Sequence, residues 1–153
     1  MSAPRLPWTT LAPAQYKSLA GVNQALASSS LGGALIELVQ TRVSQINGCA
    51  FCIDMHVREL RKSGESWQRL SLVAAWSEAG DLFTARERAA LNWAEKMTRL
   101  ADNPIDRGPD FEALREHFSE QEIVELTWTV AVINAWNRMA VGMHNPISGR
   151  PIE

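Results

Sequence analysis

The chain has 153 residues, with 15 Lys plus Arg against 17 Asp plus Glu and a formal net charge of −2. This length suits one globular domain, residues 1–153, whose core needs no disulfide or metal to fold. The charge balance leaves no basic stripe for a nucleic acid and no Lys/Arg-rich amphipathic segment for an anionic membrane. No apolar run approaches the roughly 18 residues of a membrane helix, and the N-terminus lacks the apolar region of a signal peptide. We therefore expect a soluble cytoplasmic protein with no nucleic-acid or membrane partner.

The first half of the chain divides into helical segments. Pro13 favours the first turn of a helix that runs to about residue 27. A second helix is expected over residues 31–46, because apolar residues recur along one face and Asn47-Gly48 is a typical helix stop. The next helix should begin at or just before Cys49 and end at Ser63.

The second half of the chain carries clear helix starts. Ser66 can cap a helix that runs to residue 80, and a short helix is expected over 109–117. Capping boxes at 84–87 and 119–122 open two longer helices, of which the last runs from 120 to about 143. No segment shows the period-two alternation of a strand. The prediction is therefore an all-α, single-domain bundle of about six to seven helices.

The last helix is apolar on nearly every side between residues 130 and 141. A helix that is apolar all round must be covered all round, and in a small domain another subunit is a natural source of cover. Six tryptophans add side chains that are common in cores and at interfaces. We therefore predict a homo-oligomer.

The only two cysteines, Cys49 and Cys52, lie three positions apart and precede His56 by one or two helical turns. At 3.6 residues per turn, Cys52 and His56 lie about 60° and 20° around the helix from Cys49, so the three share one stripe. A helix N-terminus favours a thiolate at Cys49. Cys52 lies one turn from His56, which can act as a base. The pattern indicates an activated thiol, a resolving thiol and a base.

Two other interpretations of this segment are open. The stripe could be buried packing, made of Cys49, Ile53, His56, Val57 and Leu60. Two thiolates and an imidazole could also bind zinc, but a structural zinc site needs a fourth ligand. The remaining histidines, His117 and His144, are distant in sequence and unpaired, so we expect ordinary surface or helix-end residues there and predict neither a metal nor a cofactor.

The spacing Glu37-x11-Cys49-x2-Cys52-x3-His56 resembles the active-site signature of the AhpD-like alkylhydroperoxidases in the carboxymuconolactone decarboxylase superfamily. The segment Asn134-Ala-Trp-Asn-Arg-Met-Ala-Val141 is similar to the closing helix of its small single-domain members. The resemblance covers residues 31–141, which we take as the family core. Decarboxylase branches of the superfamily lack the cysteine pair, so lactone decarboxylation is not expected here.

The resemblance implies trimers or hexamers with thiol-dependent peroxidase activity and a role in antioxidant defence. It assigns Cys52 as the peroxidatic thiol, Cys49 as the more exposed resolving thiol that meets the reductant, and Glu37 with His56 as a proton relay. Phe51 is a departure, because well-studied members have a histidine between the cysteines; the relay is then one titratable group shorter.

Helix-dipole reasoning favours Cys49 as the nucleophile, whereas proximity to His56 favours Cys52. We assign Cys52, because the departing alkoxide also needs an acid nearby. The expected cycle reduces an organic hydroperoxide or hydrogen peroxide, forms a Cys49–Cys52 disulfide and requires an external dithiol reductant. Alternatives are a thiol–disulfide redox or sensor protein without peroxidase turnover, and a zinc-bound scaffold.

Overall fold

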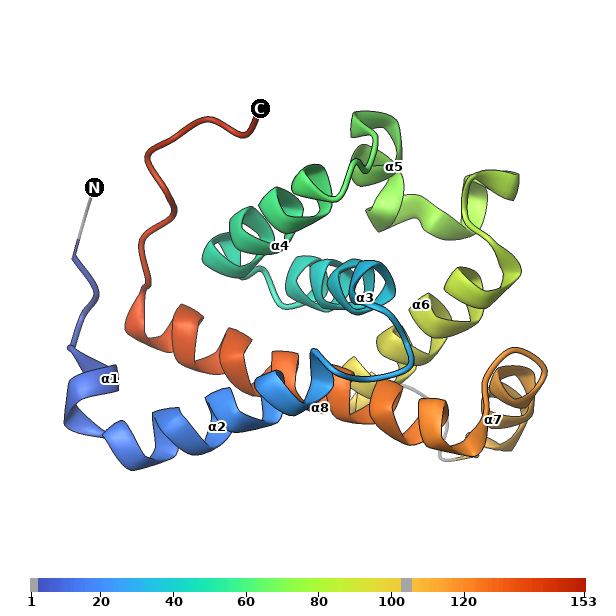
Figure 1. Ribbon diagram of the computed structural model, residues 1–153, viewed down its shortest axis with the longest axis horizontal. Coiled ribbons are helices and arrows are strands. Elements are labelled where there is room, and N and C mark those ends of the chain that lie inside the picture. The colour runs from blue at the N-terminus through green and yellow to red at the C-terminus, as the bar shows by residue number, and fades with distance from the viewer. Residues whose placement is uncertain (1–2, 103–105) are drawn as a thin grey trace.

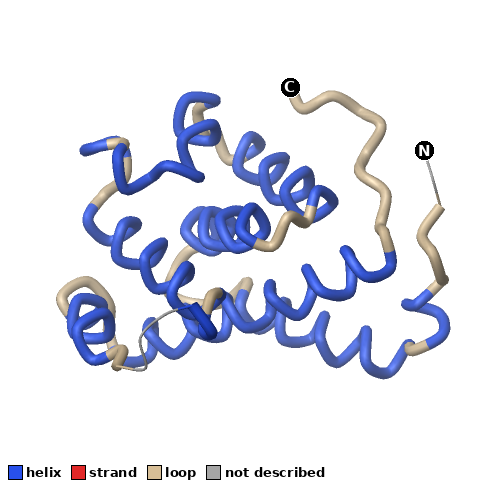
Figure 2. The backbone as a smooth tube through the Cα atoms, turned by 180° about the vertical axis from the view of Figure 1, so that it is seen from behind, coloured by secondary structure: helices blue, strands red, loops and turns tan. Residues whose placement is uncertain are grey.

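The computed structural model describes residues 3–102 and 106–153, and these residues form helices and loops without a strand (Figures 1 and 2). The α-helices are α1 (Trp8–Leu11), α2 (Pro13–Leu26), α3 (Gly33–Ile46), α4 (Ala50–Lys62), α5 (Trp67–Leu72), α6 (Ala85–Thr98), α7 (Gly108–Arg115) and α8 (Glu120–Met143). Short 3-10 segments are η1 (Val73–Glu78), η2 (Gly80–Leu82) and η3 (Leu100–Asp102). The predicted all-α class and single domain are confirmed.

The central element is α3, which packs against α4, α6 and α8. Figure 1 shows α3 nearly end-on, with α4 on one side of it, α8 on the other and α2 running beside α8. Nine of its residues are buried, including the polar side chains of Gln40, Thr41, Arg42 and Ser44. Because of this central position, the side chains of α3 reach the neighbouring helices, and one of them belongs to the candidate site described below.

Helix starts agree with the capping patterns in the sequence. Thr84 and Ser119 each form a complete capping box at the start of α6 and α8, and Ser66 accepts a hydrogen bond from the Arg69 backbone N–H. Such caps satisfy backbone N–H groups that a helix start leaves unpaired, so they act locally and can be recognised from sequence. Helix α8 spans the predicted 120–143.

Two local predictions differ from the structure. The helix expected over 66–80 is divided in the structure. Helix α5 is followed by the 3-10 segment η1, and Ala75 within η1 has a non-helical backbone (φ −121°, ψ 29°). The Arg88 guanidinium donates hydrogen bonds to the carbonyl oxygens of Trp76, Ser77 and Gly80, so tertiary contacts replace helical bonds there. The single-turn helix α1 was not predicted, because four residues are too few to show a period.

The apolar helix α8 is only partly covered within one chain. Val130, Ile133 and Ala140 are buried, whereas Val124 and Trp128 are 57% and 54% exposed. None of the helices in the described part of the chain combines the length and apolarity that crossing a membrane requires.

The two terminal segments meet beside α4 and the end of α8, and Figure 1 shows both chain ends on this side of the molecule. The Arg5 backbone N–H donates to the Met143 carbonyl at 2.8 Å, and the Trp8 indole N–H donates to Asn145 Oδ1 at 3.1 Å. The tail after α8 then follows α4, where Arg61 Nε donates to the Glu153 carbonyl at 3.0 Å. These contacts place segments from both ends of the chain next to the candidate site described below.

Candidate active site

The cysteine pair lies at the start of α4, directly after a tight turn. Gly48 has φ +65°, a conformation that glycine adopts at little cost. Cys49 is the N-cap of α4, and its Sγ accepts a hydrogen bond from the Cys52 backbone N–H at 3.3 Å. The predicted placement of the pair at a helix start is therefore confirmed.

Cys49 and Cys52 form a disulfide with a Cα–Cα distance of 5.3 Å. Both residues are 1% exposed. The expectation that Cys49 is the more exposed thiol is wrong for the single chain, because both cysteines belong to the buried hydrophobic core. An attacking molecule must therefore enter a cavity to reach either sulfur.

Glu37 of α3 and His56 of α4 are paired across the interface between their helices. His56 is 4% exposed, and its Nδ1 lies 2.7 Å from Glu37 Oε2. In the neutral imidazole the Nδ1–H donates to the carboxylate, which leaves Nε2 as the acceptor. That Nε2 is buried and has no hydrogen-bond partner among the described residues. The arrangement gives a base that is oriented by a carboxylate and ready to accept a proton.

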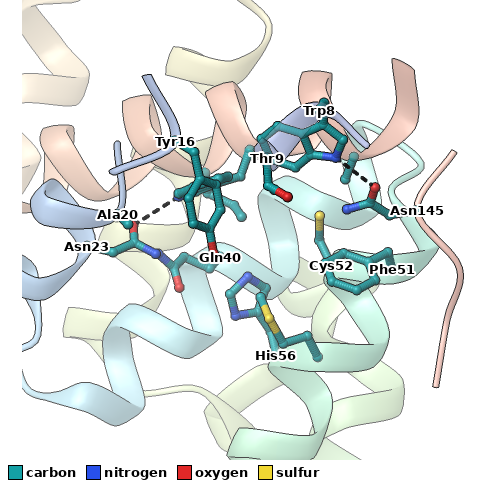
Figure 3. Close-up of a pocket in the computed structure, with 14 residues that line it drawn as sticks. Trp8, Thr9, Tyr16, Ala20, Asn23, Gln40, Phe51, Cys52, His56 and Asn145 are labelled. Atoms are coloured by element: carbon teal, nitrogen blue, oxygen red, sulfur yellow. Dashed lines mark hydrogen bonds between the residues drawn. The ribbon is translucent and has the colours of Figure 1, made fainter. Parts of the chain in front are cut away.

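Cys52 and His56 line the same cavity, which has a volume of about 380 Å³ (Figure 3). An aromatic group formed by Trp8, Tyr16 and Trp136 stands over it, with ring centroids 5.7 to 6.2 Å apart. The Trp136 indole N–H donates to Asn23 Oδ1 at 3.2 Å, which fixes the ring. The cavity thus combines the Cys52 sulfur and an imidazole nitrogen that has no partner among the described residues with a mainly apolar lining.

Sequence reasoning missed Trp8 and Tyr16 as site residues. They belong to α1 and α2, whereas their aromatic neighbour Trp136 lies more than 100 positions later in α8. No local sequence pattern connects these residues. The only indication in the sequence was that large aromatic side chains occur in an N-terminal segment for which few other core residues were predicted.

Cys49 lines a second cavity of about 400 Å³ rather than the first. The end of α8 and the following tail contribute His144, Asn145, Pro146 and Ile147 to its lining. The interpretation of His144 as an ordinary helix-end residue is therefore incomplete. It does end α8, with a left-handed backbone (φ 56°), and it also borders the cavity that Cys49 lines.

A chain of side-chain amides, of which Asn137 is buried and Asn47 and Asn134 are half-buried, holds the segment that precedes Cys49. Asn47 Nδ2 donates to Asn134 Oδ1 at 3.0 Å and to Asn137 Oδ1 at 2.9 Å. Asn137 Nδ2 in turn donates to Ser44 Oγ at 3.0 Å. The family-like segment of α8 thus fixes the end of α3 and, through it, the turn that carries the disulfide.

Another polar contact holds the tail against α4. Asp54 Oδ1 lies 2.9 Å from Arg58 Nη2, and Asp54 Oδ2 accepts a hydrogen bond from the Ser148 backbone N–H at 3.3 Å. The hydrogen bond from Arg58 lowers the pKa of the Asp54 carboxyl below its usual value, and the Ser148 contact acts in the same direction. Ionised Asp54 therefore anchors the tail that borders the second cavity.

The described residues contain no group of three or more His, Cys, Asp or Glu side chains arranged to hold a metal ion. Of the histidines, His56 is paired with Glu37, His117 follows α7, and His144 lines the second cavity with Cys49.

Comparisons with known proteins show the family to which the chain belongs. Residues 13–96, which include Glu37, Cys49, Cys52 and His56, match the carboxymuconolactone decarboxylase family. The chain is 38% identical over 143 residues to the uncharacterized protein YdfG of Bacillus subtilis (strain 168), covering 92% of this chain and 95% of YdfG. It is 30% identical over 125 residues to the uncharacterized protein YnjA of Escherichia coli (strain K12), covering 79% of this chain and 65% of YnjA.

Solved structures show the same fold. The crystal structure of ATU0492 from Agrobacterium tumefaciens, a protein of unknown function named as a candidate antioxidant defence protein AhpD, superposes with a TM-score of 0.90 at 38% identity, covering 97% of this chain and 100% of that one. An AhpD-core, peroxidase-related protein from Ralstonia eutropha JMP134 shares the fold at 24% identity with a TM-score of 0.80, covering 96% of this chain and 78% of that one. The chain is an AhpD-like member of the carboxymuconolactone decarboxylase family.

Proposed function

We propose that the protein is a thiol-dependent peroxidase that reduces organic hydroperoxides or hydrogen peroxide through Cys52 and Cys49. One observation carries the proposal: Cys52 shares an apolar cavity with His56, whose Nδ1 is bonded to Glu37 and whose Nε2 has no hydrogen-bond partner in the part of the chain that the structure describes. The cavity volume of about 380 Å³ is more than ten times the roughly 30 Å³ of one water molecule, so it also has room for an organic hydroperoxide.

The proposed reaction begins with both cysteines reduced. His56 Nε2 accepts the Cys52 thiol proton, and the thiolate attacks the terminal oxygen of the peroxide. The O–O bond breaks, the alkoxide takes the proton from His56 to leave as an alcohol, and Cys52 becomes a sulfenic acid. Cys49 then attacks the Cys52 sulfur, water leaves and the disulfide forms. The balance is one peroxide and two thiols converted to one alcohol, one water and one disulfide.

Glu37 acts through His56 in this proposal. Its carboxylate keeps the proton on Nδ1, so that Nε2 points its lone pair away from Glu37, and it stabilises the imidazolium that forms when Cys52 is deprotonated. Closing the cycle requires an external dithiol, and for that reason a reducing compartment such as the cytoplasm remains our expectation.

We also propose that the chain assembles as a homo-oligomer, with a trimer or hexamer implied by the family resemblance. The support is an exposed face of α8, defined by Val124, Trp128, Ala131, Ala135 and Arg138, whose positions share one side of the helix. Two large apolar side chains, Val124 and Trp128, are more than half exposed on this face, as expected for a surface that another subunit covers.

The alternative function, a thiol–disulfide redox or sensor protein without peroxide turnover, uses the same two cysteines. Each is 1% exposed, which limits direct exchange with a folded protein partner. We therefore favour the peroxidase, in which a small molecule enters the cavity.

A single-turnover experiment tests the proposal. The reduced protein is mixed with one equivalent of cumene hydroperoxide, and the alcohol product and free thiols are counted. We expect one alcohol formed and two thiols lost per chain, no reaction with Cys52→Ser, and one equivalent consumed by Cys49→Ser with a dimedone-reactive sulfenic acid on Cys52. Thiols that stay free while the peroxide persists would refute the peroxidase. A dimedone adduct on Cys49 in Cys52→Ser would reverse the roles of the two sulfurs.

A further inference from the structure

One side-chain amide in the cavity that Cys52 lines belongs to the tail after α8. This residue, Asn145, lies well beyond residues 13–96, which match the family model. Figure 3 shows the Asn145 side-chain nitrogen on the side of its amide that faces the Cys52 sulfur, whereas Asn23 and Gln40 lie on the opposite side of the cavity. Among the three amides that line the cavity, Asn145 is therefore the one beside the sulfur.

The Trp8 indole determines which end of the Asn145 amide faces the cavity. Its N–H donates to Asn145 Oδ1 at 3.1 Å, and because an indole N–H can only donate, the bonded atom must be the amide oxygen. The NH2 group is then directed away from Trp8. Asn145 Nδ2 has no hydrogen-bond partner among the described residues, so it can donate to a molecule in the cavity.

Backbone contacts hold both members of this pair. The Asn145 backbone N–H donates to the Ala140 carbonyl at 2.9 Å, which fixes the start of the tail against α8. The Arg5 backbone N–H donates to the Met143 carbonyl at 2.8 Å, which holds the segment that carries Trp8 against the end of the same helix. The direction of the NH2 group is thus set by the fold before a ligand enters. A donor that is already in place needs no reorganisation when charge develops nearby.

The proposed reaction needs a hydrogen-bond donor at this place. When the Cys52 thiolate attacks, negative charge moves from the sulfur to the oxygen that leaves, and a fixed N–H group stabilises such charge strongly in a water-poor site. Ile133 and Ala140 also line the cavity and are apolar. Thr9 carries a second donor on this side (Figure 3), but Thr9 is exposed and its hydroxyl has no contact among the described residues that would fix it. Asn145 is the donor that the fold holds in place.

We propose that the side-chain N–H of Asn145, oriented by Trp8, donates a hydrogen bond to the leaving oxygen of the peroxide at Cys52. This assignment rests on the proposed function, because it gives Asn145 a part in that reaction. The Cys52 sulfur bonds to the terminal oxygen, the O–O bond breaks, and its electron pair stays on the leaving oxygen. Asn145 keeps its own protons and stabilises that charge until the proton from His56 arrives. The sulfur loses two electrons in becoming a sulfenic acid, and the peroxide gains them.

The first test compares two reactions of the same sulfur. In a full-length Cys49→Ser background only Cys52 carries a thiol, and its rates with cumene hydroperoxide and with iodoacetamide are measured at pH 7. Iodoacetamide alkylates the thiolate and expels iodide, so this reaction needs no donor to oxygen. We expect Asn145→Ala to lower the ratio of the peroxide rate to the alkylation rate by about 10²-fold, as the loss of one oxyanion donor does elsewhere.

Further variants separate donation from packing. Asn145→Asp keeps an oxygen that can accept the Trp8 N–H but removes the donor, so its ratio should fall as far as that of Asn145→Ala; the alkylation rate corrects for the effect of the new charge on the Cys52 thiolate. Trp8→Phe keeps a ring but lets the amide rotate, so its ratio should fall part of the way. Ser148→Ala removes a hydrogen bond of the same tail outside the cavity and should keep the wild-type ratio.

The leaving group supplies a second readout. Hydrogen peroxide releases hydroxide, whose conjugate acid, water, has a pKa of about 15.7. Peracetic acid releases a carboxylate, whose acid has a pKa of about 4, so it needs little help from a donor. Asn145→Ala should therefore slow the reaction with hydrogen peroxide strongly and the reaction with peracetic acid weakly. A role in packing alone would slow both reactions equally.

A binding measurement separates this assignment from the proposed function. The oxidised protein has no free thiol, so cumene hydroperoxide can be titrated into it without reacting at sulfur. In isotope-labelled protein the side-chain NH2 resonances of Asn145 should shift as the ligand binds. Asn145→Ala should raise the Kd by about 2- to 10-fold, the effect of losing one neutral hydrogen bond.

Each outcome decides one of the two proposals. A wild-type ratio in Asn145→Ala, equal losses in both reactions of Cys52, or Asn145 resonances that do not move on binding would overturn the donor and leave the peroxidase standing. A wild-type ratio in Trp8→Phe would overturn the orienting role of Trp8. Shifted resonances and weaker binding by Asn145→Ala, together with no peroxide consumption by the reduced wild type, would support the donor and refute only the peroxidase.

Discussion

Replacing Glu37 by Gln tests whether its carboxylate drives the chemistry at Cys52. The substitution preserves the shape of the side chain and an oxygen that can still accept the His56 Nδ1–H, now 2.7 Å from Glu37 Oε2. It removes the negative charge that stabilises the imidazolium. The variant therefore separates the electrostatic role of Glu37 from its packing role.

The expected effects on rate and stability differ in size. A general acid–base group contributes about 10²–10⁴-fold, and we expect Glu37→Gln to slow single-turnover peroxide reduction at pH 7 by about 10²-fold. Stability should change by only about 1 kcal/mol, because a charged hydrogen bond worth about 1.5–3 kcal/mol becomes a neutral one worth about 0.5–1.5 kcal/mol, and Glu37 is partly solvent-screened at 27% side-chain exposure. Glu37→Ala leaves Nδ1 of the buried His56 unpaired and should cost about 1–3 kcal/mol.

The assay combines peroxide consumption by the reduced protein, measured from pH 5 to 9, with urea unfolding of the same samples. Glu59→Gln is the matched control, since Glu59 is an acid on α4 with 48% side-chain exposure, paired with Lys62 on the surface. The control should keep the wild-type rate. A Glu37→Gln protein with the wild-type rate and pH profile would refute the relay, whatever its stability.

Three other predictions follow from contacts outside the reacting groups. Asn137→Ala should lower the free energy of unfolding by about 1–3 kcal/mol in urea titrations, because the 1% exposed Asn137 bonds Asn47 at 2.9 Å and the buried Ser44 hydroxyl at 3.0 Å, and its loss removes both bonds; an unchanged midpoint would contradict this. Trp128→Lys should shift light scattering toward monomers, because it places a charge on the exposed face of α8 that we assign to subunit contact; a wild-type molar mass would refute that assignment. The pKa of Asp54 is lowered in the folded protein. The contribution of Asp54 to tail docking is therefore present above the pKa of the unfolded state, near 3.9, and is lost as the pH falls through the pKa of the folded state. Protection from hydrogen exchange over residues 145–153, taken relative to the intrinsic rate at each pH, should therefore fall below about pH 4 in the wild type and be low at pH 7 in Asp54→Asn; equal protection in the two proteins at pH 7 would count against the anchor.

Much of the architecture could be predicted from the sequence because it depends on local interactions. A capping side chain binds a backbone group three residues away, as Thr84 and Ser119 do, so the starts of α6 and α8 can be recognised without a fold. The family signature likewise indicated Glu37, Cys52 and His56. The structure brings all three to one region, although their roles remain proposals.

Features that depend on distant segments were decided only by the tertiary structure. The aromatic group joins Trp8 of α1 to Trp136 of α8, and the cavity that Cys49 lines is bordered by a tail that begins nearly 100 positions later. His144 likewise lines a cavity with Cys49 only because folding brings these distant segments together. Periodicity and caps report which side of a helix is apolar and where the helix begins, but they carry no information about which distant segment covers that side. The residues of the candidate site could therefore be found in the sequence, whereas the two cavities that Cys52 and Cys49 line required the folded chain.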